Sequence, residues 1–424
     1  MIPALRDRRS GSVISAPFAR TGPWPDILGF LVVSYTVLLP YQLQVTHDIN
    51  FAVADCCLLL ALLLAPGQFK YRKTAWTIWH LGLIVVFAIG TLVSALDSGE
   101  LSRYNLLNKD AGLCLLLLGY AAVTSVVTSW EDLRRILRVF VLGVVSQNLV
   151  AVAAFLAAYF FGVDTPFTSY GGQRLSGMLL DANAYGGLLV LTLIICEGAS
   201  WGPAPLFKGY SLLFFKLTLG MGILFTFSRS AWISLAVPLI VLCLFRRAAA
   251  VRIVFAGVMG GAYLLLFARS GFLGFFERMA IRPEQGESRF TLVRDALAEF
   301  ARHPVLGGGL GNFLIKEGTI VHNTSLWVLA DFGLVGLGVL LGYVGSFFAM
   351  AWHAYRFAPD REKPIVLALL LAHTAMFALS MGIEALYQRH WWLIVALIGS
   401  AYSLTRCTAE NGEAARFRAA TYRI

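Results

Sequence analysis

Residues 76–96, WTIWHLGLIVVFAIGTLVSAL, run for 21 positions without an Asp, Glu, Lys or Arg. A helix needs about 20 apolar residues to cross the hydrocarbon core of a bilayer, so this stretch alone predicts a membrane-spanning helix. Eleven more apolar blocks of similar character follow or precede it, at about 27–45, 49–66, 111–129, 134–161, 183–200, 209–227, 230–245, 249–270, 323–352, 364–382 and 389–405. We therefore predict an all-α polytopic membrane protein with about 12 transmembrane helices.

The composition of the whole chain agrees with this pattern. Of its 424 residues, 58% are hydrophobic and only 14% are charged. Soluble globular chains are about half apolar and about a quarter charged. These values exclude a soluble enzyme, a nucleic-acid-binding domain and a disordered scaffold as descriptions of the whole chain. The net charge of +10 lies mostly in short loops between apolar blocks, so orientation in the bilayer explains it without a nucleic-acid partner.

Lys and Arg are distributed unequally between alternate connections. One set carries 21 of them, at 1–26, 67–75, 130–138, 197–211, 246–252, 353–363 and 406–424. The other set carries 12, of which seven lie in a single long connection. Because short loops rich in Lys and Arg stay in the cytoplasm, we predict that the first set, including both termini, is cytoplasmic.

The predicted topology divides the chain into five parts. They are a cytoplasmic N-terminal tail at 1–26, transmembrane helices 1–9 within 27–270, an outer loop at 271–321, transmembrane helices 10–12 within 322–405, and a cytoplasmic tail at 406–424. The loop contains SRFTLVRDALAEFARHP (288–304), in which apolar residues recur at helical spacing: Phe290, Val293, Leu297 and Phe300. This spacing predicts an amphipathic helix at the outer surface, ended by Pro304.

Arg229 is the arginine that is hardest to explain as a loop residue. It stands in TFSRSAWISL (226–235), between two apolar blocks with no loop to hold it, and charge at membrane depth is costly without a partner. Ser228 can cap the following helix, whose free amides and positive dipole end would join the guanidinium in binding phosphate oxygens. The structural alternative is an ion pair with Asp331 or Glu384.

Two further arginines have the chemistry of an anion site. Arg174 lies in GGQRLSGMLLDANAYGG (171–187), where Asp181 or Asn183 can cap the next helix, and Arg289 opens the loop helix. The planar guanidinium holds phosphate through two hydrogen bonds and keeps its charge. Each charge-assisted bond contributes about 1.5–3 kcal/mol, so three arginines can hold a diphosphate without a metal. Three of the other outer arginines are interpreted as contacts to lipid headgroups, namely Arg278, Arg282 and Arg389.

His322 is the candidate catalytic base. It stands in IVHNTSLWVLADFGLVG (320–336), on the same predicted side as the arginines, and neutral imidazole is a competent base near pH 7. Asn323 can cap the helix that follows. Asp55 and Asp331 both lie within apolar blocks and can serve as counter-ions to an arginine. The outer side has no His, Asp and Glu cluster with metal-ligand spacing, so we predict neither a metal nor a cofactor.

A glycine-rich stretch precedes the candidate base. PVLGGGLGNF (304–313) lacks the Lys-Ser/Thr pair of a nucleotide-binding loop, and we interpret it as a flexible turn near the site.

Four segments together resemble the O-antigen ligase and polymerase family of bacterial envelope glycosyltransferases. They lie within residues 173–342 and read QRLSGMLLDANAYGG, TFSRSAW, ESRFTLVRDALAEFARHPVLGGGLGNF and VHNTSLWVLADFGLVG. The resemblance implies a multi-span, lipid-dependent fold like that of the GT-C glycosyltransferases, in the bacterial inner membrane. This sequence departs from the family pattern at Val293, at Asp181-Ala182 and at Asp331.

The resemblance also implies an activity and a division of roles. A glycan would pass from undecaprenyl diphosphate to an acceptor hydroxyl on the periplasmic face, with inversion and without a metal. Arg229 and Arg289 would bind the diphosphate with Arg174 as a third ligand, and His322 would activate the acceptor. Asn183, Asn323 and Asp331 are assigned supporting roles.

The acceptor and the protein class leave alternatives open. The acceptor can be a lipid A-core sugar, another lipid-linked glycan or a protein, which correspond to a ligase, a polymerase and a protein O-glycosylating enzyme. A transporter of a polysaccharide precursor or another anionic solute also fits twelve spans with both termini inside, although such carriers have two related halves, which this sequence lacks. A non-catalytic lipid-binding protein of the same fold is a third class.

Overall fold

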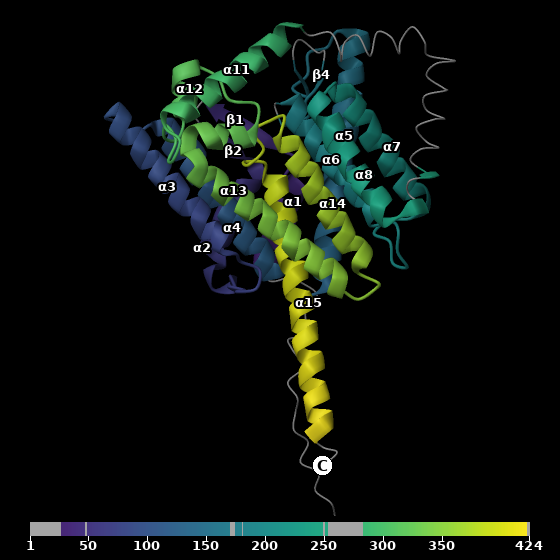
Figure 1. Cartoon of the computed structure of the whole chain (residues 1–424). Helices are drawn as coiled ribbons and strands as arrows, with labels where there is room; N and C mark the ends of the chain where they lie inside the picture. Colours follow the sequence, from purple (N-terminus) through teal and green to yellow (C-terminus); the bar gives the residue numbers. More distant parts are fainter. Residues whose placement is uncertain are drawn as a thin grey trace, which may run out of the picture.

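The computed structural model describes residues 27–46, 49–169, 174–179, 181–248, 251–252 and 283–421, and long helices dominate this part of the chain (Figure 1). In order, the helices are α1 (Ile27–Leu38), α2 (Val53–Leu64), α3 (Ile78–Ser98), α4 (Ala111–Val126), α5 (Trp130–Phe161), α6 (Ala182–Gly198), α7 (Gly209–Thr226), α8 (Arg229–Phe245), α11 (Pro283–Arg302), α12 (Asn312–Glu317), α13 (Thr324–Phe357), α14 (Lys363–Ser380) and α15 (Arg389–Thr421). Two short antiparallel hairpins accompany them, β1 (Gln42–Thr46) with β2 (Ile49–Ala52) and β3 (Thr168–Ser169) with β4 (Arg174–Leu175). A 3-10 turn, η1 (Pro66–Gln68), and a π-helical turn, η2 (Asn105–Asp110), complete these elements.

The helices confirm an all-α polytopic membrane protein. Eleven of the twelve predicted blocks contain a helix, and the block at 249–270 lies almost wholly outside the described residues. Within those residues, six helices are long and apolar enough to cross a membrane: α3, Asn105–Val126, α5, α7, α13 and α14. Four shorter apolar helices accompany them, α1, α2, α6 and α8. The total of twelve spans stays a prediction.

The first two helices are shorter than their apolar blocks predict. Both α1 and α2 have 12 residues, and the chain between them forms the β1–β2 hairpin. Pro40 explains where α1 ends, because proline lacks an amide hydrogen and disfavours helical backbone at the residue before it. The prediction that the first helix extends to residue 45 is therefore wrong, and so is the prediction that the second helix begins at residue 49.

Helix α14 forms the centre of the bundle. It packs against α6, α8, α13 and α15, and 83% of its apolar window is buried, compared with 28% for α7. Small residues permit this close packing: a Cβ added to Gly198 of α6 would lie 2.8 Å from the Cα of Ala368 in α14. Small residues at helix contacts are the usual way in which helices associate closely inside a membrane. The less buried helices present apolar side chains outward, where lipid would solvate them.

Helix α13 is broken at Gly333, and the glycine-rich stretch fills the break. Gly333 has φ 62° and ψ −157°, a conformation that requires glycine. The interrupted backbone bonds instead with the stretch: Leu334 N donates to Pro304 O (2.9 Å), and Gly309 N donates to Asp331 O (3.0 Å). Residues 307–313 are buried. The predicted flexible turn is therefore wrong, because the stretch supplies backbone partners that a broken helix inside an apolar bundle needs.

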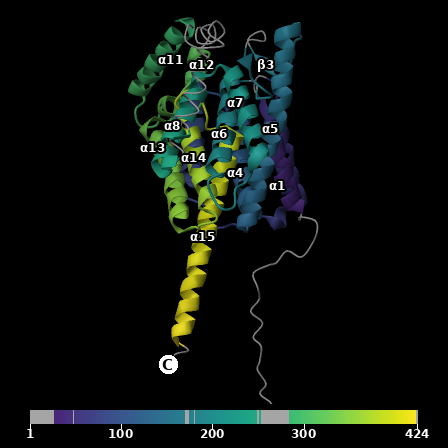
Figure 2. The same cartoon turned by 90° about the vertical axis from the view of Figure 1, so that its right-hand side faces the viewer.

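The loop helix and the C-terminus lie at opposite ends of the bundle. Figure 1 shows α11, α12 and β4 at the top and the end of α15 at the bottom, and Figure 2 shows the same separation after a quarter turn. The amphipathic helix predicted from the loop is confirmed as α11, which packs against α13 and ends two residues before Pro304. Its predicted apolar stripe is only partly covered, because Phe290 is 80% exposed. The assignment of the two ends to membrane sides stays a prediction.

Candidate functional site

A cavity of about 140 Å³ lies where α11, the start of α13 and the α14–α15 connection meet. A cavity of about this volume holds a single six-membered ring. Its lining residues are Arg289, Leu292, Val293, Val321, His322, Asn323, Met381 and Gly382. The structure thus brings the predicted base, one predicted diphosphate ligand and one predicted supporting residue to a single cavity.

The backbone around His322 is fixed by hydrogen bonds on its C-terminal side. Asn323 is the N-cap of α13, since its Oδ1 accepts from Leu326 N at 3.0 Å, and its Nδ2 donates to Met381 O at 3.1 Å. The predicted cap is confirmed. Thr324 Oγ1 donates to Ile383 O (2.9 Å) and accepts from Ala385 N (2.8 Å). These bonds join the segment that carries His322 to residues 381–385, of which Met381 and Gly382 line the cavity.

The surroundings of His322 favour its neutral form. Burial lowers the pKa of the imidazole below its usual 6.5, and the positive charge of Arg289 lowers the pKa further. The negative charges of Asp181 and Glu384 act in the opposite direction but do not reverse the shift. His322 is therefore neutral near pH 7, which is the protonation state that a general base needs.

Arg289 approaches the same cavity from α11. Its side chain is half-buried, and Leu292 and Val293 follow it along the helix and line the cavity with it. Because Arg289 and His322 line the same cavity, the charge of the guanidinium adds to the effect of burial in lowering the pKa of the imidazole. An arginine beside a neutral base gives the cavity one group that binds anions and one group that accepts protons.

Arg229 is the first residue of α8 and is exposed. The predicted cap is confirmed, because Ser228 Oγ accepts from Ala231 N at 3.2 Å. Among the described residues, the Arg229 guanidinium has no hydrogen bond or ion pair. Arg229 does not line the cavity, but its neighbour Ser230 packs on the cavity wall: a Cβ added to Gly382 would lie 2.2 Å from Ser230 Oγ. The N-terminus of α8 therefore adjoins the cavity.

The alternative ion pairs for Arg229 are not formed. Glu384 pairs with Lys109 instead. Asp331 is fully buried, and its carboxylate accepts hydrogen bonds from Gly311 N at 2.9 Å and Trp327 Nε1 at 2.8 Å. Asp331 therefore holds the glycine-rich stretch against α13, and the interpretation of its carboxylate as a counter-ion to an arginine is wrong.

Arg174 is buried behind the N-terminus of α8. Its Nε donates to Thr226 O (2.8 Å), and one terminal nitrogen donates to Asn183 Oδ1 (2.9 Å). The same amide oxygen accepts from Ser228 Oγ at 2.8 Å. Arg174 and Asn183 thus form a network that supports the cap of α8. Asp181 caps α6 through its bond from Asn183 N at 2.7 Å. Direct contact between Arg174 and a diphosphate stays a prediction.

Arg389 pairs with Asp55, one of the two carboxylates that the sequence offered as a counter-ion to an arginine. Arg389 donates from Nε to Asp55 Oδ1 at 2.9 Å and from a terminal nitrogen to Oδ2 at 2.6 Å, and both residues are buried. Its interpretation as a contact to lipid headgroups is therefore wrong. The sequence offered Asp55 as a counter-ion, but the two residues are 334 positions apart, so nothing local identified Arg389 as its partner. Arg278 and Arg282 lie outside the described residues.

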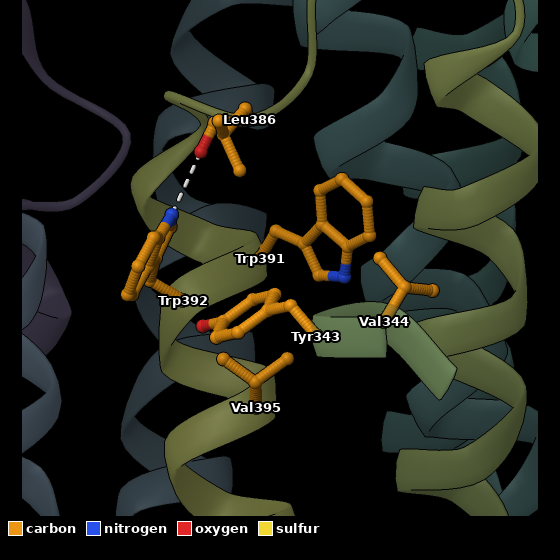
Figure 3. A pocket seen from close by; sticks show the side chains of 6 residues that line it. All are labelled: Tyr343, Val344, Leu386, Trp391, Trp392 and Val395. Carbon is orange, nitrogen blue, oxygen red and sulfur yellow. Dashed lines mark hydrogen bonds between the residues drawn. The ribbon is translucent and has the colours of Figure 1, made fainter. Parts of the chain in front are cut away.

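A second cavity, shown in Figure 3, is too small to be a substrate site. It has a volume of about 10 Å³, which is about the space that one water molecule requires. Aromatic and aliphatic side chains surround it, including Tyr343 from α13 and Trp391 from α15. Trp392 Nε1 donates to Leu386 O at 2.7 Å, which ties the α14–α15 connection to α15.

The sequence did not predict that the α14–α15 connection forms part of the cavity wall. Met381 and Gly382 line the cavity, yet neither residue type indicates a site, and their closeness to His322 arises only from long-range folding. Gly382 has no room for a Cβ beside Ser230, and this close approach can be recognised only in the structure. In the described part of the chain, no three His, Cys, Asp or Glu side chains are grouped so that they could hold a metal ion.

The fold and this site define a multi-pass membrane protein with a cationic cavity at one end. A model of the O-antigen ligase family matches residues 214–341, a range that includes Arg229, Arg289 and His322. The chain therefore carries an O-antigen ligase region, and the resemblance to that family is confirmed there. The first of the four resembling segments, which holds Arg174 and Asn183, precedes the matched range. A comparison with curated proteins gave no match.

Proposed function

We propose that this protein is a glycosyltransferase of the bacterial inner membrane that moves a glycan from undecaprenyl diphosphate to an acceptor hydroxyl on the periplasmic face. The observation that carries the proposal is the shared cavity of His322 and Arg289 within the region matched by the O-antigen ligase family. The family match favours this reaction over the transport of a polysaccharide precursor.

His322 acts as the general base in this proposal. A neutral imidazole nitrogen takes the proton of the acceptor hydroxyl while the hydroxyl oxygen attacks the anomeric carbon of the donor. The bond between that carbon and the diphosphate oxygen breaks, and its electron pair leaves with the diphosphate. Direct displacement inverts the anomeric configuration. The lowered pKa of His322 supports this role, because the base is already unprotonated at neutral pH.

Arg289 and Arg229 stabilise the leaving diphosphate. Arg289 supplies a guanidinium at the cavity, and Arg229 supplies a second one at the capped start of α8. The free amides and positive dipole end of α8 add to the charge of Arg229. Charge develops on the diphosphate in the transition state, so donors held in place before the reaction lower the barrier. Arg174 acts through Asn183 and Ser228, which hold the start of α8.

The substrates follow from the same chemistry. The donor is a glycan on undecaprenyl diphosphate, and the acceptor is a lipid A-core sugar or another glycan, so the reaction is that of a ligase or a polymerase. We favour these two over a protein acceptor. Both termini are proposed to be cytoplasmic, which agrees with the separation of the loop helix from the end of α15. The arginines bind the diphosphate without a metal.

The test is the substitution His322→Ala in purified protein, assayed for transfer of glycan from undecaprenyl diphosphate to lipid A-core and glycan acceptors. Loss of the general base should lower the rate about 10²–10⁴-fold while the thermal unfolding midpoint stays unchanged. The matched control is His303→Ala, because His303 is a half-exposed histidine at the same end of the bundle and outside the cavity. Full activity of a folded His322→Ala variant would remove His322 from the mechanism.

A further inference from the structure

A buried ion pair lies beside the site, outside the set of groups that are proposed above to take part in the reaction. Lys109, in η2, donates from Nζ to Glu384 Oε1, and the side chains of the pair are only 7% and 8% exposed. The rings of Tyr387 and Trp327 lie 4.7 and 4.8 Å from Nζ. Aromatic faces attract an ammonium ion, so the lysine is held from several directions.

Stability alone explains such a pair poorly. Removing two charges from water is costly, and a well-packed apolar pair of similar volume is often as stable as a buried ion pair. The aromatic rings around Lys109 would accept an apolar side chain equally well. A buried pair in this setting therefore calls for a role that an apolar pair could not fill.

Hydrogen bonds attach Glu384 to the segment that carries His322. Thr324 bonds to the residues on both sides of Glu384, donating to Ile383 O and accepting from Ala385 N. Asn323 holds Met381 O in the same way. Thr324 thus fixes the backbone on both sides of Glu384, and Lys109 fixes its carboxylate.

Three charged groups act on His322, each from a different element. Arg289 of α11 opposes protonation, whereas Asp181 before α6 and Glu384 favour it. Asp181 is exposed, so water screens its charge, while Glu384 is buried and screened less. When the base takes a proton, the imidazolium forms beside the positive Arg289. A buried negative charge offsets that repulsion.

We propose that Glu384, held in place by Lys109, is a positioning residue that stabilises the protonated form of His322 during the reaction and fixes the adjoining cavity wall. This inference rests on the proposed role of His322 as the base. It assigns to the α3–α4 connection and the α14–α15 connection a joint part in a reaction whose other groups lie on α8, α11 and the start of α13.

The experiment uses a charge-neutral double variant, Lys109→Met with Glu384→Gln, in the full-length protein. Removing both charges avoids an unpaired buried ion, so the unfolding midpoint should stay near that of the natural protein. We expect kcat to fall about tenfold with KM unchanged, because the imidazolium then forms without its buried negative neighbour. The acid limb of the kcat profile should move to lower pH, because loss of a neighbouring negative charge lowers the pKa of His322.

The matched control replaces another Lys–Glu pair, Lys216→Met with Glu197→Gln. This pair joins α7 to α6, and neither residue lines the cavity. It should change neither kcat nor the pH profile. Lys109→Arg keeps the positive charge, so it should keep the pH profile of kcat of the natural protein. This variant provides a second test if the double variant folds poorly.

Two outcomes separate this inference from the proposed function. A double variant with unchanged kcat and pH profile overturns the role of Glu384, and Lys109→Arg with a shifted acid limb does the same. If His322→Ala keeps full activity, the proposed function fails instead. An inactive His322→Ala beside an unchanged double variant therefore refutes only the role of Glu384.

Discussion

Arg229 and Arg389 are each the first residue of a helix at the same end of the bundle, yet their surroundings are opposite. Arg389 opens α15 and is buried, with both oxygens of Asp55 bonded to its guanidinium. Arg229 opens α8, is exposed, and has no such partner within the described chain. The comparison teaches that position at a helix start does not decide function. An arginine whose donors are already used by a carboxylate stabilises the fold, and one whose donors face outward can bind an anion.

The largest expected effect is on stability, from breaking the buried pair with Arg389→Ala. The change leaves the Asp55 carboxylate buried without its partner and should cost about 3–5 kcal/mol. The thermal unfolding midpoint in detergent measures this loss, and the yield of folded protein should fall with it. The matched comparison is Arg229→Ala, which should leave the midpoint unchanged. Equal losses for the two variants would remove the distinction between them.

The second effect is on the reaction rate, from Arg229→Ala. Loss of one preorganised donor to the leaving group should lower kcat about 10²–10³-fold, with the fold intact. Arg229→Lys keeps the charge but loses the paired donors of the guanidinium, so it should recover only part of the rate. Glycan transfer by purified protein is the measurement. An Arg229→Ala variant with the natural rate would show that the exposed arginine serves another purpose.

The smallest expected effect is a change in pH dependence, which in Arg289→Gln accompanies the fall in kcat caused by loss of a diphosphate ligand. Wild-type activity should decline with falling pH only below the usual imidazole pKa of 6.5, because burial and Arg289 lower the pKa of His322. Removing the positive charge makes protonation easier, so the pKa rises and the acid limb moves to higher pH. Arg294→Gln is the control, since Arg294 is exposed on the same helix and contacts Asp295. An unmoved acid limb in Arg289→Gln would separate Arg289 from His322.

Features set by local sequence were predictable. The apolar blocks located eleven helices, and the caps Ser228 and Asn323 were expected because both residue types bond the amides of the turn that follows. The loop helix was also expected from its spacing and from Pro304. These features depend on neighbours within a few positions, which a sequence displays directly.

Features set by long-range contacts were not predictable. The partner of Arg389 is 334 residues away, and the glycine-rich stretch was taken for a turn because nothing local shows the break at Gly333 that it fills. The cavity wall at Met381 and Gly382 was missed for the same reason. Of the three arginines expected at the diphosphate, the structure places Arg289 at the cavity, Arg229 beside it and Arg174 in a supporting network.

Glycan transfer by this protein is tested most directly by following the donor in vesicles that contain the purified protein. The donor is an undecaprenyl-diphosphate glycan labelled in both the lipid and the sugar, and the acceptor is present on the side of the loop helix. We expect free undecaprenyl diphosphate and glycosylated acceptor to form in equal amounts, and neither product to form with His322→Ala. Movement of the intact donor across the membrane without cleavage would contradict this expectation.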